Sequence, residues 1–173
     1  MNITMARSIA NELRMESQKT RKLFERIPVA DLDWKPHAKS MTIRQLASHI
    51  AESFTWIEPM LDDDVFEMDP ATYTPWIAGS VEELLSALER NVDDAAERLE
   101  PVSDARMLGN WTMRVGGKTV ITSPRASVVK VFALGHHIHH RGQLDVYLRL
   151  RDVPLPHIYG PTADEPDMVP SAS

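Results

Sequence analysis

Five of the seven histidines fall in two places: His49 lies in the first third of the chain, and a run of four lies between residues 136 and 140. If the run is helical, His136 and His140 lie about 40° apart on one face and one turn apart, so both imidazoles can reach a single ion. A third ligand must then come from a neighbouring segment. His49 is the candidate, because it lies along the edge of the apolar stripe of its own segment. The spacing therefore predicts a divalent metal site of three histidines, with a position left open for water or substrate.

Plainer interpretations of the same histidines stay open. A single helical histidine is more often a hydrogen-bonded core residue than a ligand, and a histidine run can be a surface tract that binds metal only adventitiously. The run lies between Phe132 and Leu144 in an amphipathic segment, so its inward members must meet the core. His137, about 100° from His136, is expected to face solvent or to lie at a helix contact. His139 is expected either to hydrogen-bond beside the site or to lie at an oligomer interface.

Four segments with apolar residues at helical spacing must position these side chains. They predict an all-α fold, a four-helix bundle, with helices over residues 4–26, 42–61, 80–100 and 123–151. Ser40 or Thr42 is expected to cap the second helix, and Ser80 with Glu83 has the spacing of a capping box for the third. Pro124 suits the first turn of the last helix, which carries the histidine run.

The segments between the helices differ in character. Residues 63–79, rich in Pro, Asp and Thr, predict a long loop, and the β-prone run around Gly116 and Gly117 predicts a small hairpin rather than a sheet. We expect residues 1–160 to form a single bundle domain and residues 161–173 to form a mobile tail. Four tryptophans are expected to anchor the core or the loops rather than to form a substrate cage: Trp34, Trp56, Trp76 and Trp111.

Composition narrows the possible function classes. Acidic residues outnumber basic ones 25 to 19 and no basic stripe is present, which argues against nucleic-acid binding. No window holds the ~20 apolar residues of a membrane span. The N-terminal segment also lacks the apolar core of a secretory signal, so we expect a cytoplasmic protein without a membrane partner. The chain has no cysteine, so a metal must be bound by histidine, carboxylate or water, and a thiol nucleophile would have to come from a co-substrate.

Two motifs give the chain a family resemblance. The segment from His136 to Gln143 follows the pattern H-x-x-H-H-R-G-Q, and His49 closes the upstream Leu-Ala-Ser-His. Together with the later Val-Pro-Leu-Pro exit from the last helix, these residues resemble the DinB family over about residues 4–160. The resemblance implies a four-helix bundle of up-down-down-up connectivity, frequent homodimers, and a divalent ion, commonly nickel or zinc, bound by His49, His136 and His140.

The resemblance leaves the reaction open. Relatives with known activities include thiol-dependent transferases and isomerases that activate a low-molecular-weight thiol, such as mycothiol or bacillithiol, at the metal. The first hypothesis is therefore a metal-dependent transferase in which the ion lowers the pKa of a bound thiol for attack on a small-molecule substrate. A metal-dependent hydrolase and a non-catalytic metal-binding stress-response protein are the alternatives.

Four further residues lie near the predicted ligands in the sequence. Glu52, one turn after His49, could act as a base, although a solvent-facing carboxylate is the commoner outcome. Arg141 could steer a carboxylate-bearing substrate, although an ordinary partner for an acid at the helix surface is commoner. Gln143 is expected to hydrogen-bond within the bundle, and Gly142 to permit close helix packing.

Overall fold

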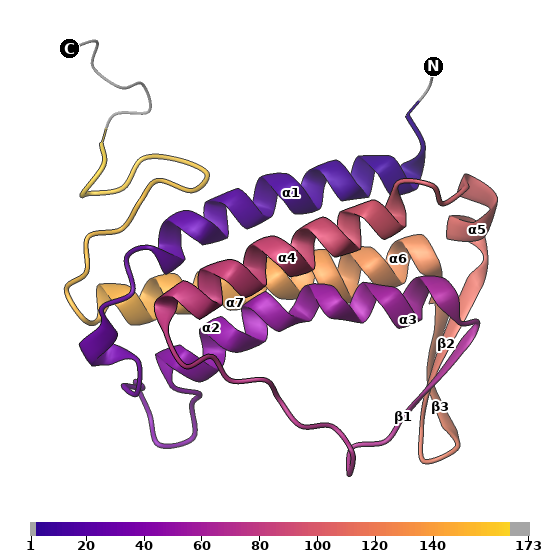
Figure 1. Ribbon diagram of the computed structural model, residues 1–173, viewed down its shortest axis with the longest axis horizontal. Helices are drawn as coiled ribbons and strands as arrows, with labels where there is room; N and C mark the ends of the chain where they lie inside the picture. Colours follow the sequence, from indigo (N-terminus) through magenta and orange to yellow (C-terminus); the bar gives the residue numbers. More distant parts are fainter. Residues whose placement is uncertain (1–2, 167–173) are drawn as a thin grey trace.

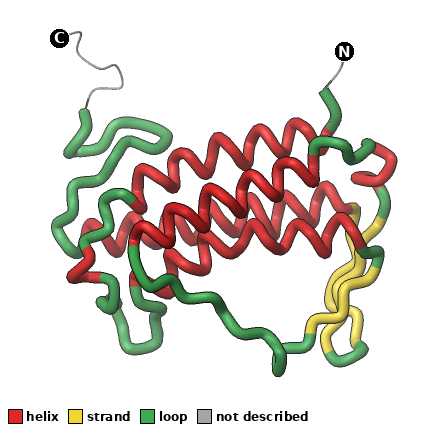
Figure 2. Tube along the Cα trace, in the orientation of Figure 1, coloured by secondary structure: helices red, strands yellow, loops and turns green. Residues whose placement is uncertain are grey.

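The computed structural model describes residues 3–166, and helices dominate it, with one small sheet gathered at one end (Figure 1). Four long helical stretches lie side by side (Figure 2), with α1 packed on α4, α4 on α2 and α2 on α7. Their bounds match the four predicted helices closely: α1 (Met5–Phe24); α2 (Ile43–Glu52), η2 (Ser53–Trp56) and α3 (Ile57–Asp62); α4 (Val81–Leu99); α6 (Arg125–Val129), η3 (Lys130–Gly135) and α7 (His136–Arg149). Residues 167–173, over half of the predicted mobile tail, lie outside the described residues.

Helices α2 and α4 begin at hydrogen-bonding caps. The Thr42 hydroxyl accepts from the backbone N–H of Gln45, whose side chain accepts from the N–H of Thr42 in return, so Thr42 rather than Ser40 caps α2. The Ser80 hydroxyl accepts from the N–H of Glu83, as predicted for α4. The Glu83 carboxylate, however, accepts from the N–H of Gly79, so only half of the predicted capping box forms.

Two of the four stretches are irregular next to the histidines. The second of the four stretches narrows to a 3₁₀ turn, η2. There the Ser53 hydroxyl donates to the carbonyl of Ile50, and the Thr55 hydroxyl donates to the carbonyl of Glu52. Such side-chain hydrogen bonds to the preceding turn compete with the backbone hydrogen bonds of the helix and bend it. The last stretch widens to a π turn, η3, directly before α7. A π turn holds one residue more than the α-helical turn, and such turns are frequent at functional sites.

The sheet corrects several sequence predictions. It contains β1 (Val65–Met68), β2 (Asn110–Val115) and β3 (Lys118–Pro124), with β1 parallel to β2 and β2 antiparallel to β3. The β2–β3 hairpin turns at Gly116 and Gly117, whose φ angles of 56° and 75° favour glycine. The prediction of a hairpin rather than a sheet was wrong, because the connection predicted as a loop supplies β1. The fold is therefore not all-α, and Pro124 ends β3 instead of lying in the first turn of α6.

A short helix and one buried arginine attach the sheet to the helices. Helix α5 (Asp104–Leu108) was not predicted, and it precedes β2 directly. Arg125, at the start of α6, is 1% exposed. Its guanidinium donates to the carbonyls of Met60 at 3.1 Å, Asn110 at 3.0 Å and Asp63 at 2.8 Å, and it pairs with the Asp64 carboxylate. Arg125 thereby links α6 to the end of α3 and to the start of β2.

The core lies between the four helical stretches. Each stretch contributes leucines that are 0% exposed: Leu13, Leu46, Leu84 and Leu144. Burying one such side chain stabilises the fold by roughly 1.5–3 kcal/mol. Trp111 is buried and donates its ring N–H to the carbonyl of Pro59, while the other tryptophans pack partly buried against the core. Among the described residues, no helix is both long and apolar enough to cross a membrane.

Candidate metal centre

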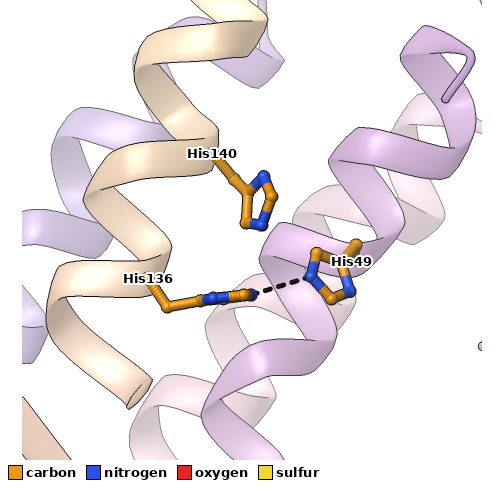
Figure 3. A group of neighbouring side chains, drawn as sticks. All are labelled: His49, His136 and His140. Atoms are coloured by element: carbon orange, nitrogen blue, oxygen red, sulfur yellow. Dashed lines mark hydrogen bonds between the residues drawn. The ribbon is translucent and has the colours of Figure 1, made fainter. Parts of the chain in front are cut away.

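Three histidines from two helices converge between α2 and α7. The imidazoles of His136 and His140 lie one above the other on α7 and point toward His49 on α2 (Figure 3). The Nε2 atoms of His49 and His136 are 2.8 Å apart, and one ring nitrogen from each of the three residues lies within 4.8 Å of the others. Two nitrogens bound to one ion at 2.0–2.1 Å lie about 3 Å apart, so the cluster is close to the size that a divalent ion requires.

Partial burial keeps these imidazoles neutral. Burial lowers the pKa of His136 to about 4, helped by the charges of His140 and His49. Burial also lowers the pKa of His49, with a smaller effect from His140, and it lowers the pKa of His140. A metal binds the neutral imidazole through a ring-nitrogen lone pair, so protons do not compete with the ion for this site near neutral pH.

Gln143 orients His140 from one turn further along α7. Its side-chain oxygen lies 2.7 Å from Nδ1 of His140, and its amide nitrogen lies 3.1 Å from Nε2 of the exposed His139. Because the amide oxygen is an acceptor, Nδ1 of His140 carries the proton and Nε2 keeps its lone pair. The expected hydrogen bond of Gln143 within the helices is confirmed, and His139 contacts the site through it.

Trp56 is a neighbour of the site that the sequence prediction missed. Its ring centroid lies 5.4 Å from that of His49 and 5.1 Å from that of His136, so the indole forms one wall of the cluster. The sequence prediction treated Trp56 only as an anchor, although a spacing of seven residues from His49 repeats the same helix face after two turns.

Glu52 lies three residues after His49 but does not belong to the group of three histidines that could hold an ion. It is half-buried, and its carboxylate accepts a hydrogen bond of 3.1 Å from the Tyr73 hydroxyl in the connection after β1. Burial and the nearby charge of Glu52 raise the pKa of Tyr73 to about 12, so the phenol stays a donor. The expectation of a solvent-facing Glu52 therefore needs correction: the connection covers part of it.

Two neighbours of the three histidines are buried against α1. His137 is 0% exposed, packs on the Phe54 ring and lies 2.6 Å from the Thr20 hydroxyl through Nε2, so the helix-contact alternative holds and the solvent-facing one was wrong. Arg141 is 3% exposed and pairs with Glu16 at 2.6 Å, so it is neither a surface residue nor free to steer a substrate. Helix α7 contacts both α1 and α2, and two of its faces are buried as a result.

Gly142 does not serve close packing. A Cβ atom built at this position would meet no atom within 4 Å outside its own helix, so the prediction that it permits close helix contact was wrong. The position is exposed in the described structure.

The comparison with known proteins supplies the family. The sequence profile described as "DinB family" matches residues 1–168. The chain belongs to the DinB family. No curated protein shows significant similarity to it.

Two solved DinB-like structures share the fold. A DinB-like protein from Bacillus subtilis is 20% identical, with a TM-score of 0.66, and the match covers 87% of this chain and 96% of that one. A DinB-like protein from Bacillus cereus is 17% identical, also with a TM-score of 0.66, over 84% of this chain and 92% of that one. At identities this low, the structural match establishes a shared DinB-like fold and nothing of the chemistry.

Proposed function

We propose that this DinB protein is a metal-dependent transferase that binds one divalent ion, nickel or zinc, through His49, His136 and His140 and activates a low-molecular-weight thiol. The observation that carries the proposal is the convergence of three half-buried, neutral imidazoles from α2 and α7 on a space of metal-site size. When bound, the ion would supply a positive charge that lowers the pKa of a thiol ligand. The three histidines are only half-buried, so solvent still reaches them.

The ligand number supports a reactive site over a structural one. Structural zinc sites are closed by four protein ligands, whereas catalytic sites keep a position for water or substrate. Among the described residues, the group that could hold an ion contains three histidines and no carboxylate. Trp56 packs against the cluster on one side, and Gln143 holds His140 in the tautomer that can bind an ion.

The composition supports an external thiol. The chain contains no cysteine, so a thiol nucleophile can reach the site only as a separate small molecule. A metal-dependent hydrolase, with water in place of the thiol, is the second candidate function. A non-catalytic metal-binding stress-response protein is the third, and the open three-histidine arrangement argues against it.

The proposal also covers the fold, the oligomeric state, the cellular location and the kind of partner. We infer a four-helix bundle of up-down-down-up connectivity over residues 1–160, a homodimer, and work in the cytoplasm on a small molecule without nucleic acid or membrane. The side-by-side packing of α1, α4, α2 and α7 supports the bundle. The excess of acidic residues supports the lack of a nucleic-acid partner. Sedimentation equilibrium would test the dimer directly.

Thiol binding to the cobalt-substituted protein separates the candidates. A thiolate bound to Co²⁺ produces a sulfur-to-metal charge-transfer band in the near ultraviolet, and we expect this band when bacillithiol or mycothiol is added. A control with the corresponding disulfide should produce none. If cobalt loads stoichiometrically but neither thiol changes the spectrum, the transferase proposal fails and ester or amide hydrolysis becomes the function to assay.

A further inference from the structure

A cluster of polar side chains lies behind the histidine site, between α7 and α1. His137 and Arg141 each follow one of the proposed ligands by one residue, so they occupy the neighbouring face of the same two helical turns. Both are buried, 0% and 3% exposed, and both face α1. We call the group formed with their partners the α1–α7 polar cluster: Glu16, Thr20, His137, Arg141 and Tyr159.

Hydrogen bonds join the members of this cluster into one chain. The Thr20 hydroxyl lies 2.6 Å from Nε2 of His137. Arg141 donates to the carbonyl of Glu16 at 3.0 Å and to the Thr20 hydroxyl at 3.5 Å, and pairs with the Glu16 carboxylate at 2.6 Å. Tyr159, from the segment after α7, accepts from Arg141 at 2.7 Å and donates to the Glu16 carboxylate at 2.6 Å.

The carboxylate in the cluster is held in its charged form. Burial alone would raise the pKa of Glu16, but hydrogen bonds from Lys19, Tyr159 and Arg141 outweigh burial and lower it. Lys19 reaches the second carboxylate oxygen at 2.6 Å, so both oxygens of Glu16 have partners. The Glu16–Arg141 ion pair within the cluster is therefore fully hydrogen-bonded at its carboxylate.

Stability alone does not explain such an ion pair. Apolar residues of similar volume in place of a buried ion pair are often as stabilising or more so, because the charges lose their hydration. Directed hydrogen bonds differ from apolar contacts in fixing orientation, since they weaken steeply when donor and acceptor are misaligned. Helix α1 packs mainly against α4, and its contact with α7 is small, so the cluster is the main directional contact between α1 and α7.

The orientation of α7 matters because metal coordination is demanding. Ligand distances are held within about 0.2 Å of their ideal values. A rotation of a helix by about 10° moves a side-chain tip that lies about 6 Å from its axis by about 1 Å. A small rotation of α7 would thus carry His136 and His140 out of register with His49 on the other helix.

We propose that the α1–α7 polar cluster sets the rotation of α7 and so positions His136 and His140 toward His49, with Thr20 and Arg141 as positioning residues. This role rests on the metal function proposed above. It extends the site to α1, which supplies no ligand, and to Tyr159 in the segment that follows α7.

Zinc affinity and stability, measured separately, test the role. Thr20→Val and Arg141→Met remove the polar groups and keep the volume nearly constant. We expect both to weaken zinc binding, measured by competition with a chromophoric chelator, by about 10- to 100-fold. Thr20→Ser keeps the hydroxyl and should bind zinc nearly as tightly as wild type. Thermal unfolding in excess chelator reports the stability of each metal-free variant.

Arg125→Met is the matched control. It removes another buried arginine from the same helical stretch, but one that contacts the ends of α3 and β2 instead of α1. We expect it to lower the melting temperature of the metal-free protein while its zinc affinity stays close to that of wild type. A merely structural role for the polar cluster would give Arg141→Met this same pattern.

The outcomes are distinguishable. If Thr20→Val and Arg141→Met fold and bind zinc as tightly as wild type, the positioning role is wrong while the metal site stands. If Arg141→Met does not fold, the comparison of zinc affinity between Thr20→Val and Thr20→Ser decides whether the positioning role holds. If the wild-type protein itself binds neither zinc nor nickel, the proposed function fails and the positioning role fails with it.

Discussion

His49 and His136 are 87 residues apart in the sequence, yet their Nε2 atoms lie 2.8 Å apart across the contact between α2 and α7. Two neutral imidazoles that meet nitrogen to nitrogen can share only one proton, and the acceptor lone pair of a third ring, His140, lies in the same space. A divalent ion satisfies all three lone pairs at once, which is why this contact is the centre of the functional proposal.

Gln143 should matter for metal affinity more than for folding. Its side-chain oxygen fixes the tautomer of His140, so Gln143→Leu should weaken zinc binding by about 10- to 100-fold, a range typical of groups that orient a ligand. Chelator competition measures the change. His139→Ala removes only the far end of the same hydrogen-bond chain and should have a smaller effect. Equal effects of the two variants would contradict the assigned role of Gln143.

The metal-free protein should lose stability as the pH falls. Burial, aided by neighbouring histidines, holds the pKa of His136 at about 4, and burial with the charge of Arg141 holds that of His137 at about 3. The corresponding pKa in the unfolded chain is about 6.5. Below that value the unfolded chain binds more protons than the folded one, so the free energy of unfolding falls as the pH drops from about 6.5 towards 4.

Urea midpoints in excess chelator measure this dependence. His136→Gln should lose stability less steeply than wild type across the same pH range, because one of the depressed groups is gone. The exposed His37 supplies the control, since His37→Gln should follow the wild-type curve. Parallel curves for His136→Gln and wild type would show that His136 titrates normally in the folded protein.

Gly142→Ala should stabilise the protein. The glycine lies exposed inside α7, and a Cβ there meets no atom within 4 Å outside its own helix. Alanine in a helix interior is favoured over glycine by about 1 kcal/mol. Urea unfolding of the metal-free variant should therefore show a gain of about that size. A clear loss of stability would mean that another surface, such as a second copy of the chain, packs against this position.

Trp56 should report metal binding. Its ring is in contact range of two of the three proposed ligands, so Ni²⁺ bound there should quench its fluorescence by close-range contact. A nickel titration of wild type should show a saturable loss of tryptophan emission, and Trp56→Phe should remove most of that loss. Trp76→Phe is the control and should show nearly the same nickel-dependent loss of emission as wild type. Quenching that survives Trp56→Phe would place the nickel elsewhere.

The parts of the site that the sequence predicted share a simple physical origin. The spacing of His136 and His140 follows from helical periodicity, and the apolar stripes of the four stretches predict which elements carry the three histidines. Thr42 was among the expected caps because capping is a local interaction within a few residues. Properties that depend on one helix at a time were thus accessible from the sequence.

What the sequence did not predict depends on contacts between distant segments. Strand β1 is four residues long and pairs with β2, about 45 positions later, which no local pattern reports. Arg141 was expected at the helix surface, and His137 either in solvent or at a helix contact, because a single apolar stripe does not show whether a second face is buried. Helix α7 packs between α1 and α2, and its second buried face is polar and marked by no apolar stripe. The π turn η3 likewise adds one residue without a distinctive local sequence.

The metal content of protein purified without a histidine tag tests the central claim most directly. Elemental analysis of wild type should give close to one divalent ion per chain. His49→Ala and His140→Ala should lose it, while His37→Ala, which alters an exposed histidine away from the cluster, should keep it. A wild-type protein without metal whose melting temperature ignores added zinc and nickel would contradict the account. So would His49→Ala and His140→Ala variants that retain a full ion.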